Sequence, residues 1–507
     1  MTVNGSKAGG PHLADLPLDA IRSAVLERAE KLGCSHAEVR VERIRSQMVS
    51  HRDAQLETSV DDTDIGLGVR VVRNGSIGFA ATVALDPGAA AVAAERAVEM
   101  SDASAAALAR PVELADEPSH GVVEWVAPYE IDPTTVPQAE KAALLERWSR
   151  ALLDAPGVDH VTAHVLAVSE DKYYADLSGT VTTQRRVRVH PVVEAVAVNA
   201  TEGGFESMRT IAQPVGKGWE YLLGAGWDFD AELAEIPELL AAKVAAPSVE
   251  PGEYDLVIDP SNLFLTIHES IGHATELDRA LGYEAAYAGT SFATFDKLGS
   301  LQYGSPVMNV TGDRTALHGL ATIGYDDEGV AAQRFDIVRD GILVGYQLDR
   351  RMARDNGLGR SNGCAYAQSA LFTPMQRMAN VSLAHSGPAG PSTEALISGV
   401  ERGIYIVGDK SWSIDMQRHN FQFTGQRFFR IEGGKLAGQV KDVAYQSRTT
   451  DFWGAMEAVG GESTYVLGGA FNCGKGQPGQ VAPVSHGCPS ALFRGITVLN
   501  ARAESGR

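Results

Sequence analysis

The 507-residue sequence lacks the features of several large protein classes. Its four cysteines are too few for a secreted scaffold held together by disulfides, and such sparse use of cysteine is typical of a reducing compartment. No run of about 18 uncharged apolar residues occurs, so the sequence contains no candidate transmembrane helix. The stretch from Met1 to Leu13 is polar and lacks the apolar core of a secretion signal. We therefore expect a cytoplasmic protein without a membrane partner.

Positive charge is also scarce, because 44 lysines and arginines face 64 acidic residues and the formal net charge is −20. An acidic surface repels phosphate backbones, so we expect no nucleic-acid partner. No Gly-x-Gly-x-x-Gly motif opens a helix after a strand, which excludes a dinucleotide-binding fingerprint. The basic cluster Arg185-Arg186-Val187-Arg188 is interpreted as the solvated face of a strand. With 44% hydrophobic and 21% charged residues, the composition is that of a folded globular protein.

Residues 1–248 alternate between helical and strand patterns and are predicted to form an N-terminal α+β domain. Apolar residues three and four apart predict a helix over 17–32, which ends at Gly33. Strands are predicted over 37–49 and 68–82, the second folded into a hairpin at Asn74-Gly75. The other predicted elements are a helix over 87–104, a connector between two sub-regions near 105–132, a helix over 137–153, strands over 158–168 and 181–198, and a helix over 231–244.

Residues 249–507 are predicted to form a β-rich domain. The Pro- and Gly-containing stretch 246–252 is the best candidate for a domain boundary. Turn pairs such as Asp340-Gly341 and Gly433-Gly434 separate apolar runs, which is typical of antiparallel hairpins. The predicted fold class is therefore α+β, with an N-terminal α/β-mixed region followed by a β-rich C-terminal catalytic domain that carries a metal-binding helix.

The chemistry of the sequence is concentrated in a segment that runs from a strand at Val257 through Asp259-Pro-Ser261 into a helix, where Asp259 or Ser261 can cap the helix start. This segment contains His268-Glu269-x-x-x-His273. From the content of His and Glu, about 0.04 such matches are expected by chance in a chain of this length. The competing interpretation is a pair of histidines that only form hydrogen bonds in the core.

The spacing of the two histidines makes a structural prediction. In a regular helix, residues i and i+5 point about 140° apart, so His268 and His273 could not bind one metal ion together. A π-type or broken turn would bring them to the same side, and Gly272 eases such a distortion. Glu269 would then lie beside the metal, where it can take a proton from a metal-bound water.

Two histidines need a third protein ligand if one coordination position is to stay open for water and substrate. Glu276 is a candidate because it follows His273 by three residues. Cys473 is another, since its glycine and lysine neighbours indicate an exposed and mildly electropositive setting that favours the thiolate. The remaining candidates are Asp278, Cys364, His419, His486 and Cys488.

The motif from His268 to Asp278, together with Tyr325-Asp-Asp-Glu-Gly329 and Asn472-Cys473-Gly-Lys-Gly-Gln-Pro478, resembles the TldD/PmbA family of metallopeptidases. The resemblance covers nearly the whole chain. It implies a zinc ion (Zn²⁺) bound by His268, His273 and Cys473, with Glu269 as general base. Glu276 and Asp278 are then assigned to positions behind the ligands, where carboxylates orient imidazole rings.

The same resemblance implies a function and a partner. PmbA-type (TldE-like) members lack the His-Glu-x-x-x-His motif, whereas this chain retains it and is interpreted as the TldD-type catalytic subunit. We expect a zinc-dependent metallopeptidase that hydrolyses amide bonds of unfolded or extended peptides, including leader-peptide or modified-peptide processing. It is expected to act as a heterodimer with a PmbA/TldE-type subunit or as a homodimer.

Two other functions fit the sequence. One is an amide hydrolase that acts on a small-molecule conjugate, suggested by the stretch 408–419, where the resemblance leads us to expect more glycine. Trp412, His419 and Phe421 could shape a pocket there, although ordinary strand packing explains them as well. The other is a non-catalytic peptide-binding subunit with structural zinc, in which His486 or Cys488 fills the fourth coordination position.

Overall fold

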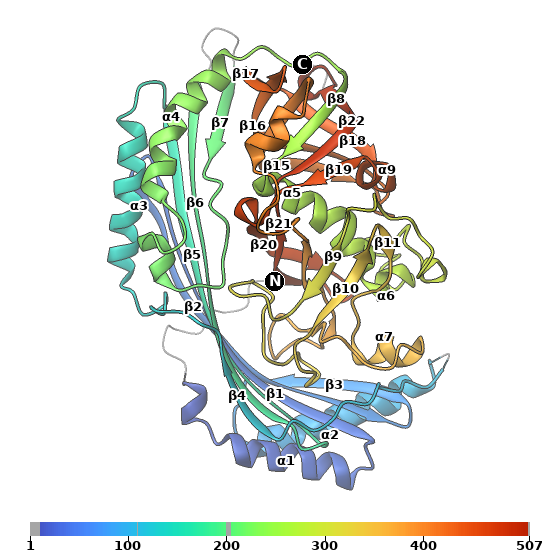
Figure 1. Ribbon diagram of the computed structural model, residues 1–507. Coiled ribbons are helices and arrows are strands. Elements are labelled where there is room, and N and C mark those ends of the chain that lie inside the picture. Colours follow the sequence, from blue (N-terminus) through green and yellow to red (C-terminus); the bar gives the residue numbers. More distant parts are fainter. Residues whose placement is uncertain (1–10, 109, 199–203, 505–507) are drawn as a thin grey trace.

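The computed structural model describes residues 11–108, 110–198 and 204–504, so the first ten residues of the polar N-terminal stretch lie outside the described part. The fold is a strand-rich mixture of helices and strands built around two large sheets (Figure 1). The predicted α+β class is therefore confirmed.

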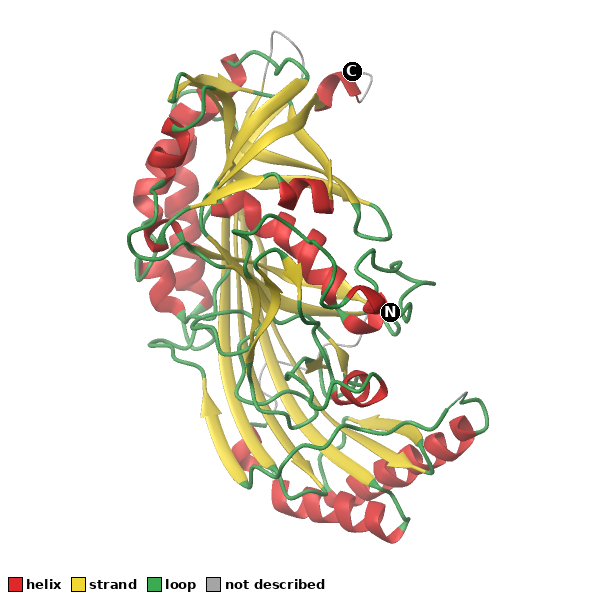
Figure 2. Ribbon diagram, turned by 45° about the vertical axis from the view of Figure 1, so that its right-hand side comes forward, coloured by secondary structure: helices red, strands yellow, loops and turns green. Residues whose placement is uncertain are grey.

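The first large sheet has the strand order β3-β2-β1-β5-β6-β4, with β7 also paired to β6. All its pairs are antiparallel except β4 with β6. Its strands are β1 (His36–Arg52), β2 (Gln55–Arg73), β3 (Ser76–Thr82), β4 (Val122–Val126), β5 (His160–Asp176), β6 (Val181–Val198) and β7 (Phe205–Arg209). The long central strands bend around the C-terminal half of the chain (Figure 2).

Four helices cover one face of this sheet. Side chains of a strand alternate between two faces, and the odd-numbered residues Val39, Val41 and Val49 of β1 are all buried. The first two pack with helices α1 (Leu18–Lys31) and α2 (Pro87–Ala105), and the third with α3 (Gln138–Leu153) and α4 (Phe229–Ala245). The helices thus form one apolar layer along the outer face (Figure 1).

The opposite face of the sheet is polar yet buried, and it contradicts one prediction. Arg186 and Arg188 are only 5% and 4% exposed, and both bind the carboxylate of Glu170 on the neighbouring strand. Lys172 lies on the same face and binds Asp327 from the C-terminal half at 2.7 Å. The interpretation of the Arg185–Arg188 cluster as a solvated face is therefore wrong for Arg186 and Arg188, because the second half of the chain covers them.

The second large sheet closes on itself. Its order is β15-β8-β22-β18-β16-β17, and β15 also pairs with β16, so five strands form a closed ring. β17 pairs with β16 and β19 pairs with β22, and neither belongs to the ring. The strands are β8 (Gly252–Ile258), β15 (Arg402–Ile414), β16 (Asn420–Glu432), β17 (Lys435–Val440), β18 (Val443–Arg448), β19 (Met456–Val459) and β22 (Ala491–Asn500).

The remaining elements are short. Their strands are β9 (Val310–Asp313), β10 (Arg334–Arg339), β11 (Ile342–Leu343), β12 (Ala365–Tyr366), β13 (Met375–Gln376), β14 (Asn380–Leu383), β20 (Val466–Lys475) and β21 (Gln480–Cys488). The helices are α5 (Pro260–Ile267), a π-helical turn (His268–Gly272), α6 (Leu277–Ala280), α7 (Arg350–Asp355), α8 (Thr393–Ser398), α9 (Thr449–Gly454) and α10 (Ala501–Glu504). Short 3₁₀ helices span Leu13–Asp15, Trp219–Leu223, His273–Thr275, Phe295–Lys297 and Glu462–Thr464.

The predicted hairpin at Asn74-Gly75 joins β2 to β3, and both residues have the positive φ that this turn requires. The strands are longer than predicted, because the hairpin at Asp53-Ala54 carries no glycine and was missed. The predicted connector also contains β4, an edge strand. The domain boundary between residues 248 and 249 stays a prediction. Among the described residues, no helix is both long and apolar enough to cross a membrane.

Candidate metal centre

Helix α5 delivers the histidine motif into the interior. As predicted, the Asp259 side chain caps its start, accepting a hydrogen bond from the amide of Ser261 at 2.9 Å, and Pro260 occupies the first helical position. All eight residues of α5 are buried, with apolar side chains in the core around the closed sheet. The motif therefore starts from a fixed, solvent-free element.

The predicted π-type turn is present at residues 268–272. The amide of His273 donates to the carbonyl of His268, five residues earlier, and the two imidazole ring centres lie 4.7 Å apart. Gly272 has φ −52°, so its backbone does not require glycine. A Cβ atom there would lie 2.5 Å from the sulfur of Met378, and close packing is therefore the reason for glycine at this position.

Strand β20 brings Cys473 to the two histidines. Ligand atoms of His268, His273 and Cys473 all lie within 4.8 Å of one another, and Cys473 Sγ is 3.5 Å from His273 Nε2. Each of the three residues is 4% exposed. In the part of the chain that the structure describes, this is the cluster of His, Cys and acidic side chains that could hold a metal ion.

The donor set fits a late transition metal. Two imidazole nitrogens and one sulfur are ligands that zinc accepts, with one position left for water. His273 Nδ1 lies 2.8 Å from Glu276 Oε2, and His268 Nδ1 lies 2.7 Å from His486 Nε2. Partners on the Nδ1 atoms leave the Nε2 atoms facing the cluster, as is usual for metal-binding histidines.

The setting of Cys473 differs from the predicted one, because the residue is buried, not exposed. Burial favours the neutral thiol, but His273, His268 and Arg377 outweigh it and hold the Cys473 pKa well below its usual value. Arg377 also donates to the Cys473 carbonyl oxygen at 2.5 Å. The thiolate is thus favoured by neighbouring positive charge and not by solvent.

Glu269 forms an ion pair with Arg418, a residue that sequence reasoning missed. Glu269 is 6% exposed. Burial favours its protonated form, but His268, His273 and Arg418 hold the pKa of this carboxyl below its usual value. Arg418 lies in the turn between β15 and β16, where its φ is 62°. No sequence signal distinguishes it from the other arginines of the chain.

Glu276 and Asp278 lie behind the cluster, linked through Lys475. The ammonium group of Lys475 is 3.2 Å from Glu276 Oε1 and 2.7 Å from Asp278 Oδ1. Glu276 therefore bridges His273 and Lys475. Lys475 follows Cys473 by two residues, so the same strand supplies a cluster residue and the cation that holds this carboxylate.

The other candidate ligands lie apart from the cluster. Cys364 is buried, and Cys488 Sγ donates to the Pro260 carbonyl oxygen at 3.7 Å. His419 stacks on Phe292 with ring centres 5.2 Å apart. His486 does not join the cluster but lies behind it, where its ring nitrogens pair with the outer nitrogen of His268 and with the Val381 carbonyl oxygen.

The aromatic residues of the stretch 408–419 and its neighbour do not gather in one pocket. Phe421 is buried in the core, whereas Trp412 is 51% exposed on β15. Ordinary strand packing therefore explains Phe421. This hairpin contacts the histidine motif through Arg418, which forms an ion pair with Glu269.

Comparison with known proteins identifies relatives over the whole chain. The sequence pattern described as PmbA/TldA metallopeptidase C-terminal domain matches residues 251–500, and that of PmbA/TldA metallopeptidase domain 1 matches residues 37–101. A protein of Methanothermobacter thermautotrophicus named Metalloprotease is 28% identical over 492 residues, which are 96% of this chain and 99% of that protein.

A second relative and a solved structure give further information on the family and on the fold. A Saccharolobus solfataricus protein named Zinc metalloprotease TldD homolog is 24% identical over 54% of this chain and 57% of its own length. The crystal structure of TldE from Thermococcus kodakarensis aligns with a TM-score of 0.71 and 16% identity over 94% of this chain and 99% of that chain, and so has the same fold. The chain therefore belongs to the PmbA/TldD family of metallopeptidases.

Proposed function

We propose that this protein is a zinc-dependent metallopeptidase of the TldD type, with His268, His273 and Cys473 as metal ligands and Glu269 as general base. The observation that carries the proposal is the convergence of three donor side chains from two distant segments, with Glu269 directly after the first ligand. Packing of the core alone does not require two imidazoles and a thiol to meet at one point. The names of the relatives agree with this reaction class.

The chemistry divides between the metal and the protein. A zinc ion held by His268, His273 and Cys473 would supply a water of lowered pKa and would polarise the carbonyl of the scissile bond. Glu269 accepts the proton of the attacking water and passes it to the leaving amine. Arg418 holds the Glu269 carboxylate in place through its ion pair. Glu276 orients the His273 ring, Lys475 holds Glu276, and Asp278 binds Lys475 in turn.

Burial of the site supports extended or unfolded peptides as substrates. The ligands are 4% exposed and Glu269 is 6% exposed, so the surface of a folded protein cannot contact them, and this favours a single extended chain as substrate. Leader peptides and modified peptides belong to this class of substrate. A small-molecule amide conjugate would also reach the cluster and is the second candidate.

The structural-zinc alternative is disfavoured by one observation. A structural site normally has four protein ligands. Both ring nitrogens of His486 are occupied by His268 and Val381, and Cys488 donates to a backbone carbonyl elsewhere. Neither fills a fourth position, which favours an open catalytic site.

We further propose a two-subunit assembly in the cytoplasm, with a TldE-type subunit or a second copy of this chain. Support comes from the shared fold with TldE. Mixing the purified chain with a TldE-type subunit of the same organism and measuring the mass in solution distinguishes the two assemblies. A stable mass of one copy under both conditions would contradict the proposal.

The metal site is tested by metal content. Mass spectrometry should find about one zinc per chain in the wild type and none in His268→Ala or Cys473→Ala. The matched controls are His160→Ala and Cys34→Ala, which remove a histidine and a cysteine far from the cluster and should retain zinc. Zinc retained in Cys473→Ala would shift the third ligand to another residue, and absence of zinc in the wild type after reconstitution would refute the mechanism.

The role of Glu269 is tested separately. Glu269→Ala should retain zinc but lose hydrolysis of an unstructured fluorescent peptide by roughly 10² to 10⁴-fold, because the base is removed and the ligands remain. Hydrolysis at the wild-type rate would exclude this role. If hydrolysis is absent in the wild type as well, a small-molecule amide becomes the next substrate class to assay.

A further inference from the structure

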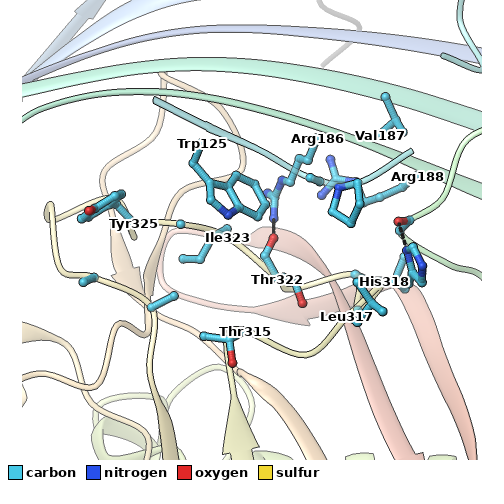
Figure 3. A pocket seen from close by; sticks show the side chains of 18 of the residues that line it. Trp125, Arg186, Val187, Arg188, Thr315, Leu317, His318, Thr322, Ile323 and Tyr325 are labelled. Carbon is cyan, nitrogen blue, oxygen red and sulfur yellow. Dashed lines mark hydrogen bonds between the residues drawn. The ribbon is translucent and has the colours of Figure 1, made fainter. Parts of the chain in front are cut away.

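A cavity of about 370 Å³ lies between the first sheet and the loop over residues 315–325, and neither the three clustered ligands nor Glu269 line it (Figure 3). A substrate of the proposed reaction must therefore be bound by the surface next to the cluster. The Arg418 side chain is 14% exposed there, against 7% for Glu269 and 5% for His273. The metal centre is thus most accessible to solvent on the Arg418 side.

Two large apolar side chains are exposed on this side. Met416 is 57% exposed and precedes Arg418 by two residues in the turn between β15 and β16. Tyr287 is 51% exposed and lies in the loop after α6. The amide of Thr290 donates to the Met416 carbonyl oxygen at 2.9 Å, and a Cβ atom on Gly289 would lie 2.8 Å from Met416 Cβ. Tyr287 and Met416 therefore belong to adjacent segments of one surface.

The Tyr287 ring also lies against the turn between β20 and β21. A Cβ atom on Gly476 would lie 2.7 Å from Tyr287 Cδ1, and one on Gly479 would lie 3.4 Å from the Tyr287 hydroxyl oxygen. Gly476 follows Cys473 by three residues on the same hairpin. Tyr287 thus contacts the hairpin that carries one proposed ligand, and Met416 lies in the hairpin that carries the partner of Glu269.

The loop over residues 281–289 is fixed from its buried side. Arg279 is fully buried and donates to the Ala288 carbonyl oxygen at 2.7 Å. Glu284 is 1% exposed, and its carboxylate lies 3.6 Å from the ammonium group of Lys475, the cation that also pairs with Glu276. Because buried charges hold the loop, Tyr287 has a fixed position beside the cluster, and little ordering is needed when it binds another group.

We propose that Tyr287 and Met416 determine specificity by binding a large apolar or aromatic side chain of the substrate peptide next to the scissile bond. The proposal rests on the proposed peptidase function and narrows its substrate class. Exposed apolar side chains that lie together mark interaction sites, and a tyrosine ring beside an adaptable methionine suits side chains of varied shape. A partner subunit would cover both side chains only by closing the side on which the centre meets solvent, which favours the substrate.

The test compares two peptides, acetyl-Gly-Gly-Phe-Gly-Gly-amide and acetyl-Gly-Gly-Ala-Gly-Gly-amide, with the zinc-loaded protein. The kcat/KM of the Phe peptide should be roughly tenfold or more above that of the Ala peptide, because its ring is buried on binding. Tyr287→Ala and Met416→Ala should each bring this ratio closer to one, whereas Tyr287→Phe should keep it. The ratio should also persist in the controls Tyr283→Ala and Met100→Ala. Tyr283 is 47% exposed in the same loop but packs against Arg351, and Met100 is 53% exposed on α2.

Binding gives a readout that does not depend on hydrolysis. Calorimetry with zinc-loaded Glu269→Ala should give a roughly tenfold lower Kd for the Phe peptide than for the Ala peptide, and adding Tyr287→Ala should reduce this difference. Absence of hydrolysis in the wild type with this difference intact would contradict the peptidase function and still support the apolar binding surface.

Three results would overturn the proposal. One is equal kcat/KM and equal Kd of the two peptides. Another is an unchanged preference in both Tyr287→Ala and Met416→Ala. The third is a smaller mass of the assembly in solution for these variants while the preference persists, which would assign the two side chains to a subunit interface.

Discussion

The Nδ1 atom of His268 lies 2.7 Å from the Nε2 atom of His486, whose own Nδ1 atom lies 2.8 Å from the Val381 carbonyl oxygen. A carbonyl can only accept, so His486 carries its proton on Nδ1 and accepts at Nε2. His268 must then carry its proton on Nδ1. This chain of two hydrogen bonds leaves the Nε2 lone pair of His268 free for a metal.

Loss of His486 should therefore weaken metal binding. His486→Ala is expected to reduce zinc affinity by roughly 10 to 100-fold, because the tautomer and orientation of His268 are no longer held. Competition with a chromophoric chelator measures the affinity. His486→Gln keeps one donor and one acceptor and should restore part of it, whereas His160→Ala should have no effect. Equal affinity in wild type and His486→Ala would refute the role.

Arg418 is expected to act as a positioning residue for Glu269. Arg418→Ala should retain zinc and lower kcat by roughly 10²-fold, with a smaller change in KM, because a misplaced base costs rate more than substrate binding. Arg418→Lys, which retains the charge, should recover part of the rate. Lys410→Ala on the same hairpin is the control. An effect on KM alone would assign Arg418 to substrate binding instead.

Gly272 is expected to be required for packing and not for its backbone freedom. Gly272→Ala should lower the free energy of unfolding by about 1–3 kcal/mol, since its Cβ would overlap Met378. Urea unfolding measures this. The double variant Gly272→Ala/Met378→Ala should lose less free energy of unfolding than the sum of the losses in the two single variants. Gly454→Ala, with no atom within 4 Å of the new Cβ, should be nearly neutral, and an equal loss there would contradict the packing argument.

The buried polar face of the first sheet should make stability depend on acid pH. Burial favours protonated Glu38, but Arg70 and His36 lower its pKa to about 2, against 4.5 for a free glutamate. The resulting stabilisation, about 3 kcal/mol, is fully present above pH 4.5 and is lost as the pH falls through about 2.

Urea unfolding at about pH 7 and about pH 3.5 tests this linkage. From the higher to the lower pH, the wild-type protein should lose more stability than the Glu38→Gln variant, which cannot titrate at this position. Glu57→Gln, an exposed residue of the same sheet, should follow the wild type. The same loss in Glu38→Gln would show that other groups determine the acid sensitivity.

Some features of the site follow from the sequence alone because they are local. The distance of five residues between His268 and His273 requires a π-type turn if both are to face one ion, and the turn is present. The capping of α5 by Asp259 and the hairpin at Asn74-Gly75 are local in the same sense. Backbone geometry and short-range hydrogen bonds determine such features, so the residue types close to them in the sequence are enough to predict them.

The contacts between residues far apart in the sequence, and the burial of charged residues, depend on the tertiary structure alone. Cys473 reaches the histidines across 200 residues because β20 lies beside α5, and Arg418 reaches Glu269 across 149. The predicted solvent exposure was wrong for Cys473, Arg186 and Arg188, because the pattern of a strand shows which residues share a face but not what covers that face. The sequence by itself therefore determined the motif, its helix and its π-turn. Long-range packing brought Cys473 to the two histidines and Arg418 to Glu269, and it buried the charged residues between the two halves of the chain.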